Sequence, residues 1–140
     1  DKFDMRVVLT GSGSMGSEID KIIAMTNGRT VNLAGKTDLK ELTAIISYSK
    51  LMITVDSGPM HIAAALGKPV IALFGPTAPW RTGPYGDRHI VIRKGLPCSP
   101  CFLKKCKDVK CMKEIEAADV MAAVEKQFDK IRQSLTGVHC

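Results

Sequence analysis

The chain has 140 residues, a length that suits one domain. Its composition, 45% hydrophobic and 24% charged, is ordinary for a globular protein, and no apolar run reaches the roughly 20 residues of a membrane-spanning helix. The net charge of +6 is modest, and because only 5% of the residues are aromatic, small aliphatic side chains must fill the interior, as in parallel-sheet α/β proteins.

Short β-rich runs alternate with amphipathic stretches along the whole chain. Strands are predicted at residues 5–9, 30–33, 51–55, 69–74 and 89–92. Helices are predicted at residues 17–26, from an Asp38 N-cap to residue 48, at 59–66 and at about 117–134. No linker or repeat divides the chain. This alternation predicts a single Rossmann-like α/β domain over residues 1–140, with a parallel sheet flanked by helices.

The motif Asp56-Ser57-Gly58-Pro59-Met60-His61 follows a predicted buried strand and opens a helix. Ligands of open α/β sheets bind beyond the carboxyl ends of the strands, where helix N-termini offer unpaired N–H groups. Gly58 would let a phosphate approach the backbone, and Ser57 could cap the helix or donate to that phosphate. Asp56 could accept hydrogen bonds from sugar hydroxyls, and His61 could donate to sugar or phosphate. Plain capping and surface roles for the same residues are the alternative.

The next predicted strand ends in a similar way, with Phe74-Gly75-Pro76-Thr77. Neighbouring parallel strands end at the same edge of a sheet. We therefore expect Thr77 and the turn at Asp56 to converge on one crevice.

The stretch from residue 55 to residue 86, VDSGPMHIAAALGKPVIALFGPTAPWRTGPYG, resembles the signature of the bacterial heptosyltransferases. Residues 31–37, VNLAGKT, followed by Leu39 and Glu41, and the cysteine-rich segment at residues 97–111 are also similar to parts of that family. The resemblance implies the C-terminal, donor-binding half of a glycosyltransferase B fold. It implies an inverting enzyme of lipopolysaccharide inner-core synthesis that needs no metal or other cofactor, in the cytoplasm and in peripheral association with the inner membrane.

Residue roles follow from the same resemblance. The donor is expected to be a nucleotide-diphosphate sugar, most often ADP-heptose. Its diphosphate would meet Ser57 and Gly58, and its sugar would meet Asp56 and His61. Glu18 would contact the ribose, and the backbone near Thr37 would flank the adenine.

Family members also carry an N-terminal acceptor domain with a carboxylate that looks like the general base, and a strand with a phosphate-binding Lys. The chain begins at Asp1, without Met or signal peptide, and shows neither feature. We expect a fragment that is inactive alone, because a general base must reach the acceptor hydroxyl. The lipopolysaccharide core acceptor would then be bound through the missing domain.

Two other functions stay open. Residues Gly11-Ser12-Gly13-Ser14-Met15-Gly16 match the dinucleotide pattern G-x-G-x-x-G, with Asp38 roughly 20 residues further on, as in NAD-binding domains. Asp38, however, is better placed to cap a helix. A non-catalytic interaction module that kept the fold is the other alternative.

Residues 88–113 are strongly basic, with eight Lys or Arg residues. Such a stretch is typical of a solvated surface and also fits attraction to an anionic acceptor or a lipid surface. Nucleic acid is not expected, because aromatic residues do not alternate with these charges.

Four cysteines lie close together in this basic stretch, at Cys98, Cys101, Cys106 and Cys111. Reduced structural thiols, a metal or iron–sulfur site, and paired disulfides are all compatible with the spacing. Cys140 is an odd fifth cysteine and is expected to be free.

Overall fold

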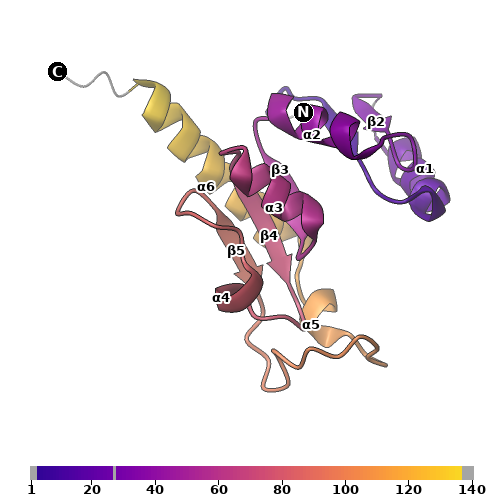
Figure 1. The fold of residues 1–140 in the computed structure, drawn as a ribbon, viewed down its shortest axis with the longest axis vertical. Helices are drawn as coiled ribbons and strands as arrows, with labels where there is room; N and C mark the ends of the chain where they lie inside the picture. Colours follow the sequence, from indigo (N-terminus) through magenta and orange to yellow (C-terminus); the bar gives the residue numbers. More distant parts are fainter. Residues whose placement is uncertain (1–2, 27, 137–140) are drawn as a thin grey trace. The chain divides into compact units, whose positions relative to one another are not determined.

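The computed structural model describes residues 3–26 and 28–136, with side chains as far as residue 133; Cys140 therefore lies outside the described residues. The chain divides into two compact units, Asp1–Ile45 and Ile46–Cys140 (Figure 1). Five parallel strands flanked by helices confirm the predicted α/β class, but the strands form a two-stranded and a three-stranded sheet where one sheet was expected. Periodicity identifies strands without saying which strands are neighbours, so it could not predict this division.

The first unit contains a parallel pair of short strands. Strands β1 (Val7–Leu9) and β2 (Thr30–Asn32) pair in a register that sets Val8 opposite Val31. Between them lie the 3-10 turn η1 (Gly13–Met15) and helix α1 (Gly16–Ala24), which buries Ile19. The two strands and α1 agree with the predicted elements to within about two residues, the usual uncertainty at element ends, whereas η1 was not predicted.

Helix α2 (Leu39–Tyr48) begins where the sequence predicts. The Glu41 N–H donates to Asp38 Oδ1 at 2.8 Å, and the Asp38 N–H donates to Glu41 Oε2 at 2.9 Å. This reciprocal pair is a capping box, which satisfies two backbone donors of the first turn. The prediction that Asp38 caps this helix is therefore confirmed.

The second unit is built on a three-stranded parallel sheet in the order β3-β4-β5, formed by β3 (Met52–Val55), β4 (Val70–Phe74) and β5 (Ile90–Arg93). The central strand β4 carries the core, because Val70, Ile71, Ala72 and Phe74 are fully buried. Strands buried on both faces have nearly continuous apolar sequences in parallel sheets, and β4 reads VIALF.

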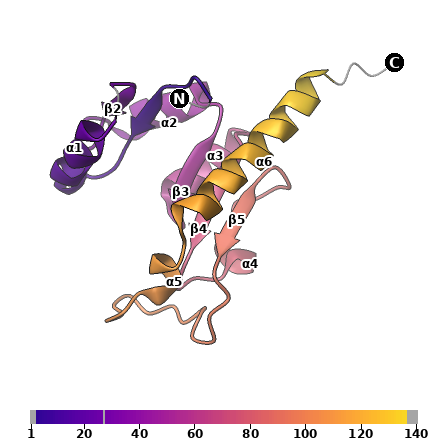
Figure 2. The same ribbon diagram turned by 180° about the vertical axis from the view of Figure 1, so that it is seen from behind.

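Helices cover both faces of this sheet. Helix α3 (Gly58–Ala65) packs against one face (Figure 1), and α6 (Ala117–Thr136) packs against the other (Figure 2). Helix α6 turns Ala123, Val124 and Phe128 toward the sheet, which is the buried stripe of an amphipathic helix. Within the described residues, no helix is both long enough and apolar enough to span a bilayer.

The start of α6 is fastened to the end of β5. The Lys94 Nζ lies 2.9 Å from Asp119 Oδ2, and the same carboxylate oxygen accepts the Glu116 N–H at 2.7 Å.

Two short helices complete the unit, α4 (Pro79–Thr82) and α5 (Lys110–Lys113). They follow β4 and the cysteine-rich segment, so both lie toward the carboxyl end of the sheet.

Candidate functional site

The turn that joins β3 to α3 holds the predicted binding motif. Asp56 follows the last residue of β3, and Ser57 occupies the N-cap position of α3 in extended backbone conformation. The register sets Val55 opposite Leu73, so the ends of β3 and β4 lie side by side. The structure thus confirms that the turn at Asp56 and the segment leading to Thr77 leave the same edge of the sheet.

Asp56 is partly buried and has a partner that the sequence did not reveal. The Thr82 Oγ1 donates to Asp56 Oδ2 at 2.9 Å, across the edge where the two strands end. Thr82 is the last residue of α4, and its hydroxyl also approaches the Ala78 carbonyl at 3.4 Å. This bond orients the Asp56 carboxylate. No motif marks Thr82, although it lies within the stretch that resembles the heptosyltransferases.

The Ser57 hydroxyl does not cap α3. Its oxygen lies 3.1 Å from Thr54 Oγ1, and no side chain of the described residues makes a cap hydrogen bond at this helix. Of the two roles that the sequence offered Ser57, side-chain capping is therefore not the one adopted. In this first turn Pro59 has no N–H, and the Met60 N–H donates to the Ser57 carbonyl at 3.1 Å. Of the first three residues of α3, Gly58 therefore keeps a backbone donor for another acceptor.

Open space lies next to the start of α3. Gly58 is exposed, and a Cβ built on it would meet no atom within 4 Å. His61 is one turn further along and is also exposed. A ligand phosphate could therefore reach the backbone at Gly58, with the His61 side chain nearby on the same helix.

The main chain that follows β4 is held in place by the cysteine-rich segment. The Ser99 hydroxyl, buried, donates to the Gly75 carbonyl at 2.6 Å, and the Cys101 N–H donates to the Pro76 carbonyl at 3.0 Å. Thr77 follows directly and is partly buried. These bonds fix the main chain that carries Thr77 to the edge of the sheet.

A family model for glycosyltransferase family 9 (heptosyltransferase) matches residues 1–112 of this chain, which include every element from β1 to β5 and most of α5. The chain belongs to glycosyltransferase family 9. Lipooligosaccharide heptosyltransferase 2 of Campylobacter jejuni is 34% identical over 127 residues, which cover 86% of this chain and 40% of that protein. The chain thus spans less than half the length of this relative.

Solved structures of the family share the fold. The structure of Escherichia coli ADP-heptose lipopolysaccharide heptosyltransferase II matches with a TM-score of 0.73 and 29% identity, over 91% of this chain and 37% of that chain. A family 9 glycosyltransferase from Veillonella parvula matches with a TM-score of 0.77 and 26% identity, over 92% and 38%. The predicted relation to glycosyltransferase B heptosyltransferases is thereby confirmed.

The remaining candidate residues of this family 9 chain belong to the first unit. Glu18 is exposed in the first turn of α1, where its Oε2 accepts the Ser17 hydroxyl at 2.9 Å. Thr37 is partly buried in the turn that precedes α2. Asp56, Ser57, Gly58, His61 and Thr77 all belong to the second unit.

The main chain of the G-x-G-x-x-G pattern packs against the β2–α2 turn in the first unit. A Cβ on Gly35, whose φ is +68°, would lie 2.6 Å from the Gly13 Cα. The Gly35 N–H also donates to the Gly11 carbonyl at 2.9 Å. Gly35 therefore has to lack a side chain for the β2–α2 turn to approach the main chain after β1 closely. A Cβ on Gly13 would meet the Gly35 Cα at an ordinary 3.7 Å, so this close approach does not require the glycines of the pattern themselves.

The four clustered cysteines are free thiols that line one cavity of about 480 Å³ between the cysteine-rich segment and α5. We call this cavity the cysteine pocket. Cys111 is buried, Cys101 is intermediate, and Cys98 and Cys106 are exposed. In the described part of the chain, no three His, Cys, Asp or Glu side chains are grouped so that they could hold a metal ion. The structure describes these four cysteines as free thiols.

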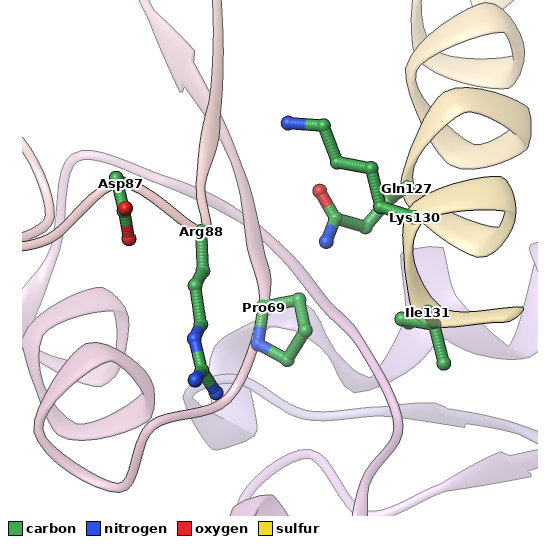
Figure 3. A pocket seen from close by; sticks show the side chains of 6 residues that line it. All are labelled: Pro69, Asp87, Arg88, Gln127, Lys130 and Ile131. Atoms are coloured by element: carbon green, nitrogen blue, oxygen red, sulfur yellow. The ribbon is translucent and has the colours of Figure 1, made fainter. Parts of the chain in front are cut away.

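A second cavity, of about 320 Å³, lies at the opposite end of β4. It is lined by Pro69, Asp87, Arg88, Gln127, Lys130 and Ile131 (Figure 3). Figure 3 shows Gln127 reaching from α6 toward Arg88 and Pro69, and its Oε1 is buried without a hydrogen-bond partner among the described residues. Pro69 precedes β4, whereas the candidate binding residues follow strands. This cavity is therefore separate from the candidate site.

Proposed function

We propose that this chain binds the nucleotide-diphosphate sugar donor of an inverting glycosyl transfer, with the diphosphate over the first turn of α3. The observation that carries the proposal is the start of this helix. It lacks a side-chain cap among the described residues, and the space beside Gly58 is open. The Gly58 N–H and the positive end of the helix dipole favour phosphate at this position.

In this proposal the sugar lies beside Asp56. The carboxylate accepts hydrogen bonds from sugar hydroxyls, and the hydrogen bond from Thr82 holds it in one orientation. The Ser57 hydroxyl donates to the diphosphate, while His61 donates to sugar or phosphate. Thr77 adds a hydroxyl from the neighbouring strand end, because β3 and β4 are adjacent and parallel.

The proposed donor is ADP-heptose. The E. coli relative is named as an ADP-heptose lipopolysaccharide heptosyltransferase, and 29% of the residues aligned with it are identical. On the nucleoside side, we propose that Glu18 binds the ribose hydroxyls and that the backbone near Thr37 flanks the adenine. Carboxylates commonly bind ribose hydroxyls in Rossmann-like domains.

The proposed reaction transfers heptose to a lipopolysaccharide inner-core acceptor. The acceptor hydroxyl attacks the anomeric carbon in line, and the start of α3 stabilises the departing diphosphate without a metal ion. The acceptor-binding surface and the general base are proposed to lie in the part of the enzyme that these 140 residues do not cover. The coverage of 40% of the Campylobacter relative supports this division. We expect no turnover by this chain alone.

The test is calorimetric titration of the chain with ADP-heptose, ADP, UDP and NAD, each in the presence of EDTA. ADP-heptose and ADP are expected to bind, ADP-heptose more tightly, and UDP and NAD are expected to bind more weakly. NAD binding well above ADP would instead favour the dinucleotide alternative at Gly11 to Gly16. If the chain binds none of the four ligands, the same titration of the full-length protein tests the proposal. Absence of ADP-heptose binding by the full-length protein would refute it.

A further inference from the structure

The cysteine pocket is a second chemically distinctive place in this fold, and the proposed donor site does not use it. One cavity gathers four thiols and three ammonium groups: its lining includes Cys98, Cys101, Cys106, Cys111, Lys104, Lys105 and Lys110. Asp108 is the acidic residue of the lining. Positive surroundings favour the thiolate, which is the reactive form of cysteine.

The pocket is held in place by main-chain contacts with the end of β4. The N–H groups of Cys101 and Phe102 both donate to the Pro76 carbonyl, at 3.0 and 2.8 Å. On the other side, Cys111 lies close to Gly75, since a Cβ on that glycine would be 3.2 Å from Cys111 Sγ. The thiols therefore belong to one anchored structure, although 13 positions of sequence separate Cys98 from Cys111.

The four thiols differ in their access to solvent and in their polar contacts. Cys111 is only 7% exposed, whereas Cys98 and Cys106 are exposed. The Cys106 Sγ accepts a hydrogen bond from the Val109 N–H at 3.4 Å. Val109 has a φ of 50°, a left-handed conformation that β-branched residues rarely adopt. The backbone thus takes an unfavourable conformation where its N–H meets this sulfur.

These contacts stabilise the charged form of Cys106. Hydrogen bonds from the N–H groups of Val109 and Asp108 lower the pKa of the Cys106 thiol, and the charge of Lys113 acts in the same direction. The Asp108 carboxylate and partial desolvation oppose this shift without reversing it. Cys106 therefore combines exposure, thiolate character and nearby thiols, which is the pattern of redox-sensitive cysteines.

We propose that Cys106 is a reactive thiol that exchanges with low-molecular-weight disulfides and then closes a disulfide with a second cysteine of the pocket. The Cys106 thiolate attacks one sulfur of the small disulfide, whose other sulfur leaves as a thiolate. A second pocket thiol loses its proton to solvent and attacks the Cys106 sulfur, releasing the second small thiolate. Two protein thiols are oxidised to one disulfide, and the small disulfide is reduced to two thiols.

The first experiment compares thiol reactivity in chains that all carry Cys140→Ser, so that four thiols remain. Native protein at neutral pH is mixed with dithiobis-nitrobenzoate, and release of the aromatic thiolate is followed over time. One thiol is expected to react in a distinct fast phase. Cys106→Ser should abolish that phase, whereas Cys98→Ser, the matched change at the other exposed cysteine, should keep it. A fast phase that persists in Cys106→Ser would overturn the proposal.

The second experiment follows the disulfide itself. Oxidised glutathione is added to the Cys140→Ser chain, and intact mass and peptide mapping are recorded without reduction. The expected product has lost two hydrogens, carries no glutathione and links Cys106 to another pocket cysteine. A stable glutathione adduct at Cys106 would contradict disulfide closure. Thiols that react only after a chelator is added would indicate a bound metal and would likewise overturn the proposal.

Neither experiment depends on nucleotide binding, so this proposal and the proposed donor site can fail separately. Far-UV circular dichroism of each variant shows whether it is folded. If Cys106→Ser does not fold, substoichiometric iodoacetamide labelling of the Cys140→Ser chain replaces it. The first labelled peptide should then contain Cys106, and preferential labelling of any other cysteine would contradict the proposal.

Discussion

The Thr82 hydroxyl donates a hydrogen bond of 2.9 Å to Asp56 Oδ2 and ties helix α4 to the turn between β3 and α3. The two residues are 26 positions apart in the chain, and each follows a different strand of the sheet. Because hydrogen bonds to charged groups are among the stronger ones in proteins, Thr82 determines where the Asp56 carboxylate points.

Replacing Thr82 by Val should therefore weaken the binding of the nucleotide-sugar. Valine keeps the shape of threonine but removes the donor, and the Asp56 carboxylate loses its fixed orientation. We expect an affinity for ADP-heptose that is roughly tenfold lower, since one hydrogen bond contributes about 1 kcal/mol or more. Affinity for ADP should change little. Calorimetric titration of both ligands tests this, with Thr82→Ser as the control that restores the hydroxyl; equal losses for both ligands would remove Asp56 from the sugar subsite.

Two glycines near the strand ends should respond to alanine in opposite ways. A Cβ at Gly58 meets open space, so Gly58→Ala should leave the urea midpoint nearly unchanged and weaken ADP binding roughly tenfold by obstructing the phosphate. A Cβ at Gly75 would lie 2.5 Å from Met112 Sδ and 2.7 Å from its Cγ, so Gly75→Ala should lower the free energy of unfolding by about 1–3 kcal/mol. Urea titration combined with calorimetry distinguishes the two. A Gly58→Ala chain that binds ADP normally would argue against phosphate at this turn.

The capping box of α2 should make a measurable contribution to stability. Asp38→Ala removes the acceptor for the Glu41 N–H, and loss of an N-cap side chain typically costs about 1 kcal/mol. Asp38→Asn keeps an oxygen in the same place and should cost much less. Urea unfolding followed by helical circular dichroism gives both values. Equal stability of the alanine and asparagine variants would show that the cap contributes nothing.

The Lys94–Asp119 ion pair should make stability depend on pH at both extremes. A side-chain hydrogen bond from Lys94, together with the Glu116 N–H, lowers the pKa of Asp119 below its ordinary 3.8, and the hydrogen bond with Asp119 raises the pKa of Lys94 above 10.5. The carboxylate therefore stabilises the fold fully above pH 3.8 and loses this effect as the pH falls through its lowered pKa. The lysine stabilises the fold fully below pH 10.5 and loses its effect as the pH rises through its raised pKa.

Asp119→Asn tests this linkage. The variant should be less stable than the unsubstituted chain between these limits, and the difference should shrink below pH 3.8 and above pH 10.5. Thermal unfolding at a series of pH values measures it, with Lys94→Met as the partner variant. A difference that stays constant across the whole range would mean that the charges do not contribute.

Local sequence was sufficient for the five strands, for the four longer helices and for the main motif, but not for the short elements η1, α4 and α5. The alternation of strands and helices, the Asp38 cap and the position of Asp56, Ser57 and Gly58 at a strand-to-helix turn all follow from patterns within a few residues. Periodicity and turn chemistry act over that range, and for this reason the predicted boundaries agree closely with the structure.

Contacts between distant residues were decided only by the tertiary structure. Nothing local distinguishes Thr82 as the partner of Asp56, and the sequence left the Ser57 hydroxyl undecided between capping α3 and binding phosphate. The spacing of the cysteines does not show that their four side chains line one cavity, as they do in the structure. The sequence by itself determined the strands and the longer helices, because backbone preferences are local. Strand pairing and packing determined which side chains meet, because those depend on residues that only the fold brings together.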